Sequence, residues 1–155
     1  MIQRIQSFYL FLIAVLSGFL LTGSVLDFID KKGSGIKVAF TEIIKSTGGQ
    51  GIEVLEKLLP LTILIIIIPV FSLMTIFLYK NRKVQLRLAL VLIILTATQL
   101  IAFVHVSLSV ISKFEAHLIP GFKMIIPVLM LILSVLAYRG IRKDERLVKS
   151  YDRLR

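Results

Sequence analysis

Long uninterrupted runs of apolar residues dominate the pattern of hydrophobic and polar positions along this chain. A spanning helix needs about 20 mostly apolar residues to cross roughly 30 Å of hydrocarbon. Four runs meet that length: residues 8–28, 58–79, 86–111 and 118–138. Strands of a membrane barrel would alternate apolar and polar residues, whereas "ILIIIIPVF" does not alternate. The pattern predicts an all-α membrane protein, with residues 1–155 forming a single domain of four transmembrane helices.

The first run could also be the core of a secretory signal, because Arg4 precedes it and the small residues Gly23 and Ser24 lie near its end. A cleavage site of the Ala-x-Ala kind is absent from this region, and the run is longer than a typical signal core. An uncleaved anchor is therefore the favoured interpretation.

Residues 29–57 form the one sizeable polar segment between spans, and glycine clusters mark its turns. Ile36, Val38 and Phe40 alternate with polar or small residues, as in a short strand. Three further aliphatic residues would suit helical turns instead: Ile43, Ile44 and Leu55. So short a segment has too little core to fold alone, and we expect it to cap the bundle.

Two segments of the chain resemble each other. Residues 67–83, "IIPVFSLMTIFLYKNRK", and residues 125–143, "IIPVLMLILSVLAYRGIRK", each carry a proline, then a tyrosine, then cations. The likeness favours two parallel helical hairpins, although apolar sequence also produces such matches by chance. Pro69 and Pro127 should each loosen or kink a helix, because proline removes a backbone donor.

Composition supports the membrane interpretation and adds an orientation. Hydrophobic residues make up 57% of the chain and mean hydropathy is +0.92, more than a small soluble domain can bury. Most lysines and arginines lie at the N-terminus, in the loop after the second run and in the tail at residues 139–155. Because cytoplasmic segments are enriched in these residues, both termini are predicted to be cytoplasmic.

The cytoplasmic cations are candidate contacts for anionic lipid head groups or for a protein partner. The tail could bend at Gly140 and lie on the membrane, where each cation contributes about 1 kcal/mol. It could instead form a docking helix with the stripe Leu147, Tyr151 and Leu154. Nucleic acid is not expected, because aromatic stacking groups are nearly absent from these segments. The candidate docking or lipid-binding residues are Arg4, Lys80, Arg82, Lys83, Arg87, Arg142, Lys143, Arg146, Lys149 and Arg153.

The third run is the most polar, and part of it forms a candidate intramembrane seam: Thr98, Gln99, His105, Ser109 and Ser112. Four of these residues share one helical face by their spacing of 7, 4 and 3. The seam could line a transport site, or it could hydrogen-bond between helices, for which such side chains are common. Packing is favoured, because a lone histidine without an intramembrane carboxylate is a poor proton relay.

No catalytic, metal or cofactor motif is found. Cysteine is absent, which excludes disulfides and thiolate chemistry, and His117 with the nearby acids lacks a metal-ligand spacing. The chain contains no nucleophile elbow, phosphate loop or HExxH helix. The sequence therefore predicts a non-enzymatic protein without a cofactor.

Three segments, "MIQRIQ", "KNRKVQLRL" and "RGIRKDERLVKSYDRLR", together resemble a family of small integral membrane proteins of Bacteroidota, domain of unknown function 4293. The resemblance covers essentially the whole chain and implies an integral protein of the bacterial inner membrane, but it implies no activity. Our leading hypothesis is an accessory or scaffold subunit with a basic cytoplasmic docking or lipid-binding face. The rivals are a small channel or transporter using the seam, and an outward-facing sensor built on residues 27–57.

Overall fold

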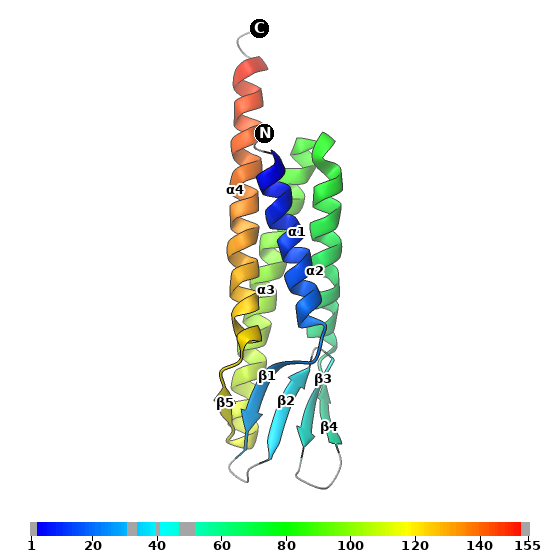
Figure 1. The fold of residues 1–155 in the computed structure, drawn as a ribbon, viewed down its shortest axis with the longest axis vertical. Helices are drawn as coiled ribbons and strands as arrows, with labels where there is room; N and C mark the ends of the chain where they lie inside the picture. The colour runs from blue at the N-terminus through cyan, green and yellow to red at the C-terminus, as the bar shows by residue number, and fades with distance from the viewer. Residues whose placement is uncertain (1–2, 31–33, 40, 47–51, 153–155) are drawn as a thin grey trace.

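A computed structural model describes residues 3–30, 34–39, 41–46 and 52–152. Within them a bundle of helices ends in an antiparallel sheet (Figure 1). The helices are α1 (Gln3–Leu20), α2 (Leu59–Phe77), α3 (Arg82–Phe114) and α4 (Ile126–Asp152), with short 3-10 turns η1 (Leu78–Lys80) and η2 (Phe122–Ile125). The strands are β1 (Ser24–Ile29), β2 (Gly35–Ala39), β3 (Glu42–Ser46), β4 (Ile52–Lys57) and β5 (His117–Ile119). The predicted all-α fold class is therefore wrong at the sheet end of the molecule.

Each helix buries one stripe of positions that are alternately four and three residues apart. In α1 the stripe is Gln6, Leu10, Ile13, Ser17 and Leu20. The same spacing runs from Leu61 to Thr75 in α2, from Gln85 to Phe103 in α3 and from Met130 to Asp144 in α4. A repeat of this kind keeps one seam facing its neighbours along slightly supercoiled helices. Burial follows the repeat and not polarity, because several of the buried side chains are polar.

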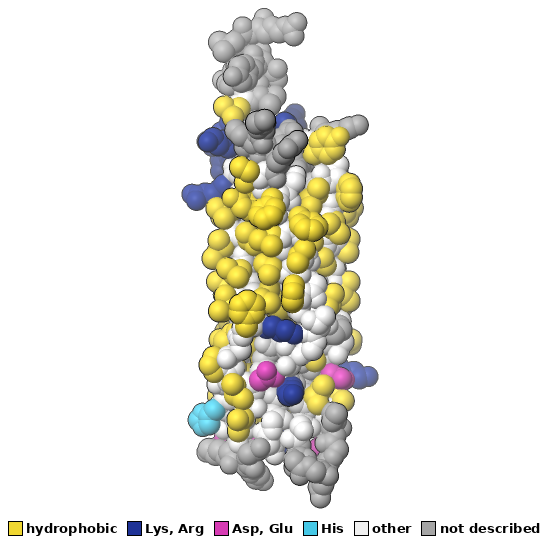
Figure 2. Space-filling view, viewed as in Figure 1, with side chains coloured by type: hydrophobic (Ala, Val, Ile, Leu, Met, Phe, Trp, Pro, Cys, Tyr) yellow, Lys and Arg dark blue, Asp and Glu magenta, His cyan; other side chains and the backbone are white. Residues whose placement is uncertain are grey.

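The opposite faces of the helices are apolar and exposed. Figure 2 shows a belt of hydrophobic side chains with lysines and arginines at one end and charged residues of both signs at the other. On α2 the belt extends from Leu59, 64% exposed, to Phe77, 76% exposed, which is about 27 Å at 1.5 Å per residue. That height approaches the roughly 30 Å of hydrocarbon in a bilayer.

Among the described residues, three helical stretches are long and apolar enough to cross a membrane: Leu59–Phe77, Arg82–Phe114 and Phe122–Leu147. The apolar part of α1, Ile5–Leu20, is shorter. It nevertheless packs along α2 and α4 and completes the bundle.

The sheet has the order β4-β3-β2-β1-β5, and all its neighbouring strands are antiparallel. Ile36 and Val38 are buried on β2, so the alternation there correctly indicated a strand, while Phe40 lies outside the described residues. The helical alternative for the following residues is wrong, because Ile43 and Ile44 lie in β3 and Leu55 in β4.

Two predicted span boundaries are also wrong. Residues 24–28 of the first predicted span belong to β1, and the fourth predicted span begins with β5 and η2, so that its α-helix starts only at Ile126. Val25, Leu26 and Phe28 are apolar because they enter the core where the sheet meets the bundle. Gly23, at a φ of +64°, turns the chain out of α1, a conformation that glycine adopts at no steric cost. Hydropathy alone cannot separate a lipid-facing helix from a buried strand that follows it.

One cluster of buried side chains continues from the bundle into the sheet, with Phe28, Ile36 and Val38 packed with Leu61 and Val110 in a single core.

A charged side chain adds to this junction. The Lys45 ammonium lies 3.2 Å from the Asp30 carboxylate and 5.7 Å from the centre of the Phe114 ring at the end of α3. The sheet therefore caps the bundle, as expected for a segment with too little core of its own.

Helix α4 is continuous through Gly140, so the expected bend of the tail onto the membrane is not seen. Figure 1 shows α4 running on past the end of the bundle. Pro69 lies inside α2, but Pro127 is the second residue of α4. A proline in the first turn leaves no helical hydrogen bond unmade, and the expected loosening or kink of a helix at Pro127 is therefore wrong.

A candidate basic docking face and its polar clasp

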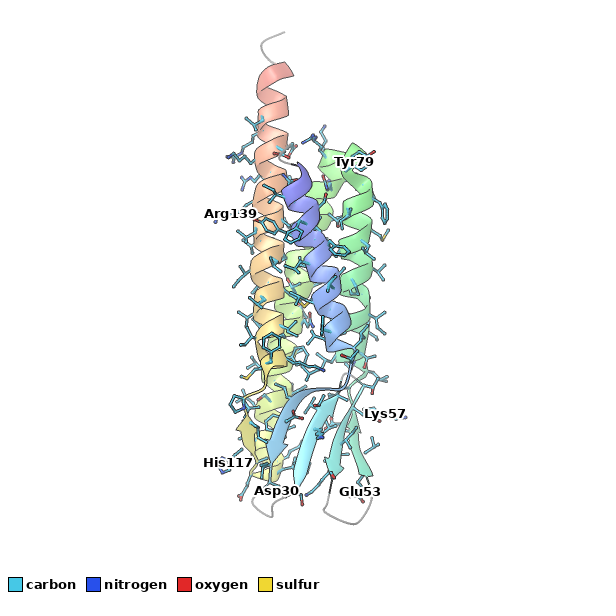
Figure 3. The ribbon with its side chains drawn as sticks, viewed as in Figure 1. Asp30, Glu53, Lys57, Tyr79, His117 and Arg139 are labelled. Carbon is cyan, nitrogen blue, oxygen red and sulfur yellow. The ribbon has the colours of Figure 1, made fainter. Side chains whose placement is uncertain are left out.

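Four exposed cations share one side of α4, at the end of the bundle away from the sheet. Arg139, Arg142, Lys143 and Arg146 follow the spacing i, i+3, i+4 and i+7, and together they line a surface hollow of about 250 Å³. Figure 3 shows Arg139 projecting outward from α4, with Tyr79 near the same end of the bundle and Lys57 and His117 at the opposite end. We call these four residues the basic face of α4.

The segment from Arg139 to Arg146 also holds two acids, Asp144 and the half-buried Glu145, and Asp144 points the other way, into the bundle. Asp144 is 7% exposed, and its Oδ2 accepts a hydrogen bond of 2.7 Å from Nε2 of Gln6 on α1. The same oxygen lies 3.8 Å from Nη1 of Arg82 at the start of α3. Asp144 thus joins three helices, and its carboxylate does not neutralise the cations on the outer side of α4.

Gly140 makes room for this arrangement. A Cβ atom built at Gly140 would lie 2.8 Å from Cγ of Gln6, closer than carbon atoms can approach, so a side chain here would displace the glutamine. We call Gln6, Arg82, Gly140 and Asp144 the polar clasp. Each of the three segments that carry the family resemblance contributes to it, so these segments meet in space.

Sequence interpretation missed the clasp, although a signal was present. Gln6 and Asp144 continue the four-and-three spacing of the buried stripes of α1 and α4. Extending those stripes through the polar residues would have placed both side chains inside the bundle. The interpretation instead considered only the cations and the apolar stripe of the tail and gave Asp144 no role.

Three of the cations that the sequence placed in the loop before the third span lie at the start of α3, and their surroundings differ. Lys83 and Arg87 are exposed, whereas Arg82 is partly buried in the clasp. Next to it, Nε2 of the buried Gln85 donates a hydrogen bond of 3.2 Å to the carbonyl of Thr75 on α2. Only part of the loop is therefore available to a partner.

Four candidate docking residues remain without a structural description. Arg153 lies outside the described residues, and the side chains of Arg4, Lys80 and Lys149 are not described either.

The candidate seam of α3 is divided between two surfaces. Thr98, His105 and Ser112 are exposed, Ser109 is half-buried, and Gln99 alone is fully buried. The Thr98 hydroxyl donates to the carbonyl of Ile94 at 2.9 Å and the Ser112 hydroxyl to that of Ser109 at 3.1 Å. Back-bonding to the same helix satisfies such hydroxyls without any partner helix, so their spacing does not mark an interface.

The buried polar stripe of α3 shares only Gln99 with that seam and also includes Thr96. Thr96 Oγ1 lies 3.2 Å from Ser134 Oγ of α4 across the bundle. One turn further, the amide of Gln99 is completely buried, and neither its Oε1 nor its Nε2 has a hydrogen-bond partner among the described residues. A buried amide without a partner costs free energy, which makes Gln99 the most unusual polar group of the bundle interior.

Within the described part of the chain, no group of three or more His, Cys, Asp or Glu residues could hold a metal ion.

An apolar belt around the helices, a sheet cap at one end and cations at the other define a class: a small helical protein with a β-sheet cap, in which three of the described helical stretches are long and apolar enough to cross a membrane. More particularly, residues 2–154 match the family described as domain of unknown function (DUF4293). The chain belongs to this family, which confirms the resemblance seen in its sequence. Comparison of this chain with the curated proteins and with the solved structures found no match.

Proposed function

We propose that this chain is a non-enzymatic accessory or scaffold protein of the bacterial inner membrane, whose basic face of α4 docks an acidic surface of a partner protein. All four helices span the bilayer and both termini lie in the cytoplasm. The sheet then faces the opposite side of the membrane. The asymmetric distribution of lysine and arginine supports this orientation.

The inward orientation of Asp144 is the observation that carries the proposal. Because Gln6 and Arg82 hold this carboxylate inside the bundle, the outer side of α4 at this level presents the cations of the basic face. The clasp also ties α4 to α1 and α3 where it leaves the bundle, so the projecting helix is anchored at its base.

A protein partner fits this geometry better than lipid head groups do. Arg139 and Arg146 are seven residues apart on an unbroken helix, which separates them by about 10 Å along its axis. The attraction of anionic lipids falls off within a Debye length of about 8 Å. Cations at the far end of the face are thus held away from the bilayer, where an acidic protein surface can reach them.

The test is site-specific crosslinking in native membranes from a photoreactive residue placed at Lys143, with products identified by quantitative mass spectrometry. A stoichiometric protein product that is lost in Arg139→Gln/Arg142→Gln/Arg146→Gln would support docking. The matched control is Lys83→Gln/Arg87→Gln, which removes exposed cations of the neighbouring helix. Equal yield in all variants, or lipid adducts alone, would refute the proposal.

Orientation can be tested separately, because the chain has no cysteine. Glu53→Cys on β4 and Arg146→Cys on α4 are both at exposed positions. A membrane-impermeant thiol reagent should label the first in intact spheroplasts and the second only after permeabilisation. The reverse pattern would place the basic face outside the cell.

The amide of Gln99, which has no hydrogen-bond partner among the described residues, favours a second candidate, a small channel or transporter that uses the polar seam of α3. This function requires that Gln99→Leu or His105→Ala reduce a solute flux in proteoliposomes. A flux equal to that of the unmodified protein in both variants would dismiss it.

A further inference from the structure

A second feature lies at the opposite end of the bundle, where α2 and α3 meet the β3 and β4 side of the sheet. A pocket of about 310 Å³ opens there between the apolar belt and the charged cap. It is lined by Ile43, Glu56, Lys57, Leu58, Pro60, Leu61, Ala102, His105, Val106, Ser109 and Lys113. It includes His105 and Ser109, which neither the polar clasp nor the basic face of α4 uses.

The lining divides into an apolar and a polar part. Leu61 of α2 and Ala102 and Val106 of α3 belong to the membrane-spanning helices and form an apolar floor. Lys57, the last residue of β4, and Lys113, in the last turn of α3, line the pocket near the sheet. The pocket thus has the polarity of a membrane interface, with apolar walls toward the bilayer and cations toward water.

Cations outnumber acids in this lining. Glu56 is its one carboxylate, and its Oε2 lies 3.1 Å from Nζ of Lys113. The two side chains are 53% and 58% exposed, and an exposed pair of this kind contributes little to stability. Lys113 can therefore turn toward a bound anion at small cost, beside Lys57.

We propose that this pocket binds an anionic amphiphile, with a phosphate or carboxylate head group at Lys57 and Lys113 and an apolar chain against Leu61, Ala102 and Val106. Ammonium groups form strong charge-assisted hydrogen bonds with such head groups. The pocket between β1, α3 and α4 provides a contrast within the molecule. It has a similar volume of about 310 Å³, but no charged side chain lines it, so it offers nothing that would select a head group.

The test uses purified full-length protein in phosphatidylcholine nanodiscs that contain a small fraction of phosphatidylglycerol with a photoreactive acyl chain. After irradiation, labelled peptides are mapped by mass spectrometry. Labelling should concentrate on residues of α2 and α3 that line the pocket. It should fall roughly tenfold in Lys57→Gln/Lys113→Gln, since each cation adds substantially to attraction for an anionic head group.

Two variants serve as controls. Lys37→Gln removes an exposed cation of β2, and Arg142→Gln/Lys143→Gln/Arg146→Gln removes most of the basic face of α4. Both should retain full labelling of the pocket. The second variant also distinguishes this site from the docking function, because it removes the cations proposed for docking and leaves the lining of the pocket unchanged.

A further variant, Ala102→Phe, fills the apolar floor and leaves both lysines in place, and it should lose the label as well. Equal labelling in the double lysine variant would overturn the proposal, as would equal labelling by a photoreactive phosphatidylcholine. A third outcome would also overturn the proposal: inorganic phosphate competes with the label, and Ala102→Phe is still fully labelled. That outcome would indicate a site for an anion without a site for an apolar chain. Circular dichroism confirms that each variant is folded.

Discussion

Replacing Asp144 with leucine tests whether the polar clasp holds the cationic end of the bundle together. Leucine resembles aspartate in shape but removes the acceptor of the 2.7 Å hydrogen bond from Gln6. A hydrogen bond to a charged group contributes about 1.5–3 kcal/mol. The contact with Arg82 is longer, at 3.8 Å, and the arginine side chain is 31% exposed, so it adds about 0.5 kcal/mol. The free energy of unfolding should therefore fall by about 2–3 kcal/mol.

The measurement is reversible unfolding in mixed micelles with increasing sodium dodecyl sulfate, followed by helical circular dichroism. Asp144→Asn is the matched control, because its amide oxygen can still accept from Gln6 while the charge is lost. It should cost less than half as much as Asp144→Leu. The double variant Gln6→Leu/Asp144→Leu removes both partners, and its loss should be smaller than the sum of the single losses by about 1–2 kcal/mol.

Two results would refute this account of the clasp. One is a loss below about 0.5 kcal/mol for Asp144→Leu, the range of ordinary surface substitutions. The other is strict additivity of the Gln6 and Asp144 variants, which would show that their contact carries no coupling free energy.

Three further predictions use the same unfolding measurement. Gly140→Ala should lower the free energy of unfolding by about 1 kcal/mol or more, although alanine has the better helix propensity, because the new Cβ would displace the side chain of Gln6. Gly18→Ala should raise it by about 0.5–1 kcal/mol, because a Cβ there meets nothing within 4 Å. A change of the same sign in both variants would contradict this reasoning. Gly23→Ala should lower the free energy of unfolding by about 1–2 kcal/mol, because the φ of Gly23 is +64°. Gly35→Ala should lower it clearly less, because a Cβ there meets nothing within 4 Å. Similar losses of stability in the two variants would exclude backbone strain as the cause. Gln99→Leu should increase stability by about 1–3 kcal/mol, because it removes a buried amide without a partner; a decrease would show that the amide is satisfied in the membrane.

The interior polar residues show how far sequence interpretation can go in a membrane bundle. The predicted seam of α3 was placed on Thr98 and His105 because their spacing is helical and polarity was taken to indicate a buried face. Of the predicted seam, the structure fully buries only Gln99, together with Thr96, which the prediction had left out. In water, polarity distinguishes the outside of a helix from the inside. In lipid the outside is apolar too, and a hydroxyl can be satisfied by its own backbone.

The sheet end shows a second limit of the same kind. The alternation of Ile36 and Val38 indicated a strand, because that signal is local to a few residues. The strand at Ser24–Ile29 was hidden inside an apolar run, because burial against a helix end and contact with lipid select the same side chains.

The sequence alone determined the membrane class, the approximate positions of the long helices, the accumulation of cations in three segments and the family. These follow from local quantities, namely the length of apolar runs, charge and short motifs, and local quantities can be read without knowing what packs against them. Only the tertiary structure decided that Asp144 points inward to Gln6 and Arg82 and that β5 joins β1. It also decided which stripe of α3 is buried. Each of these depends on a contact between residues far apart in the chain, and such contacts form only when the whole bundle packs.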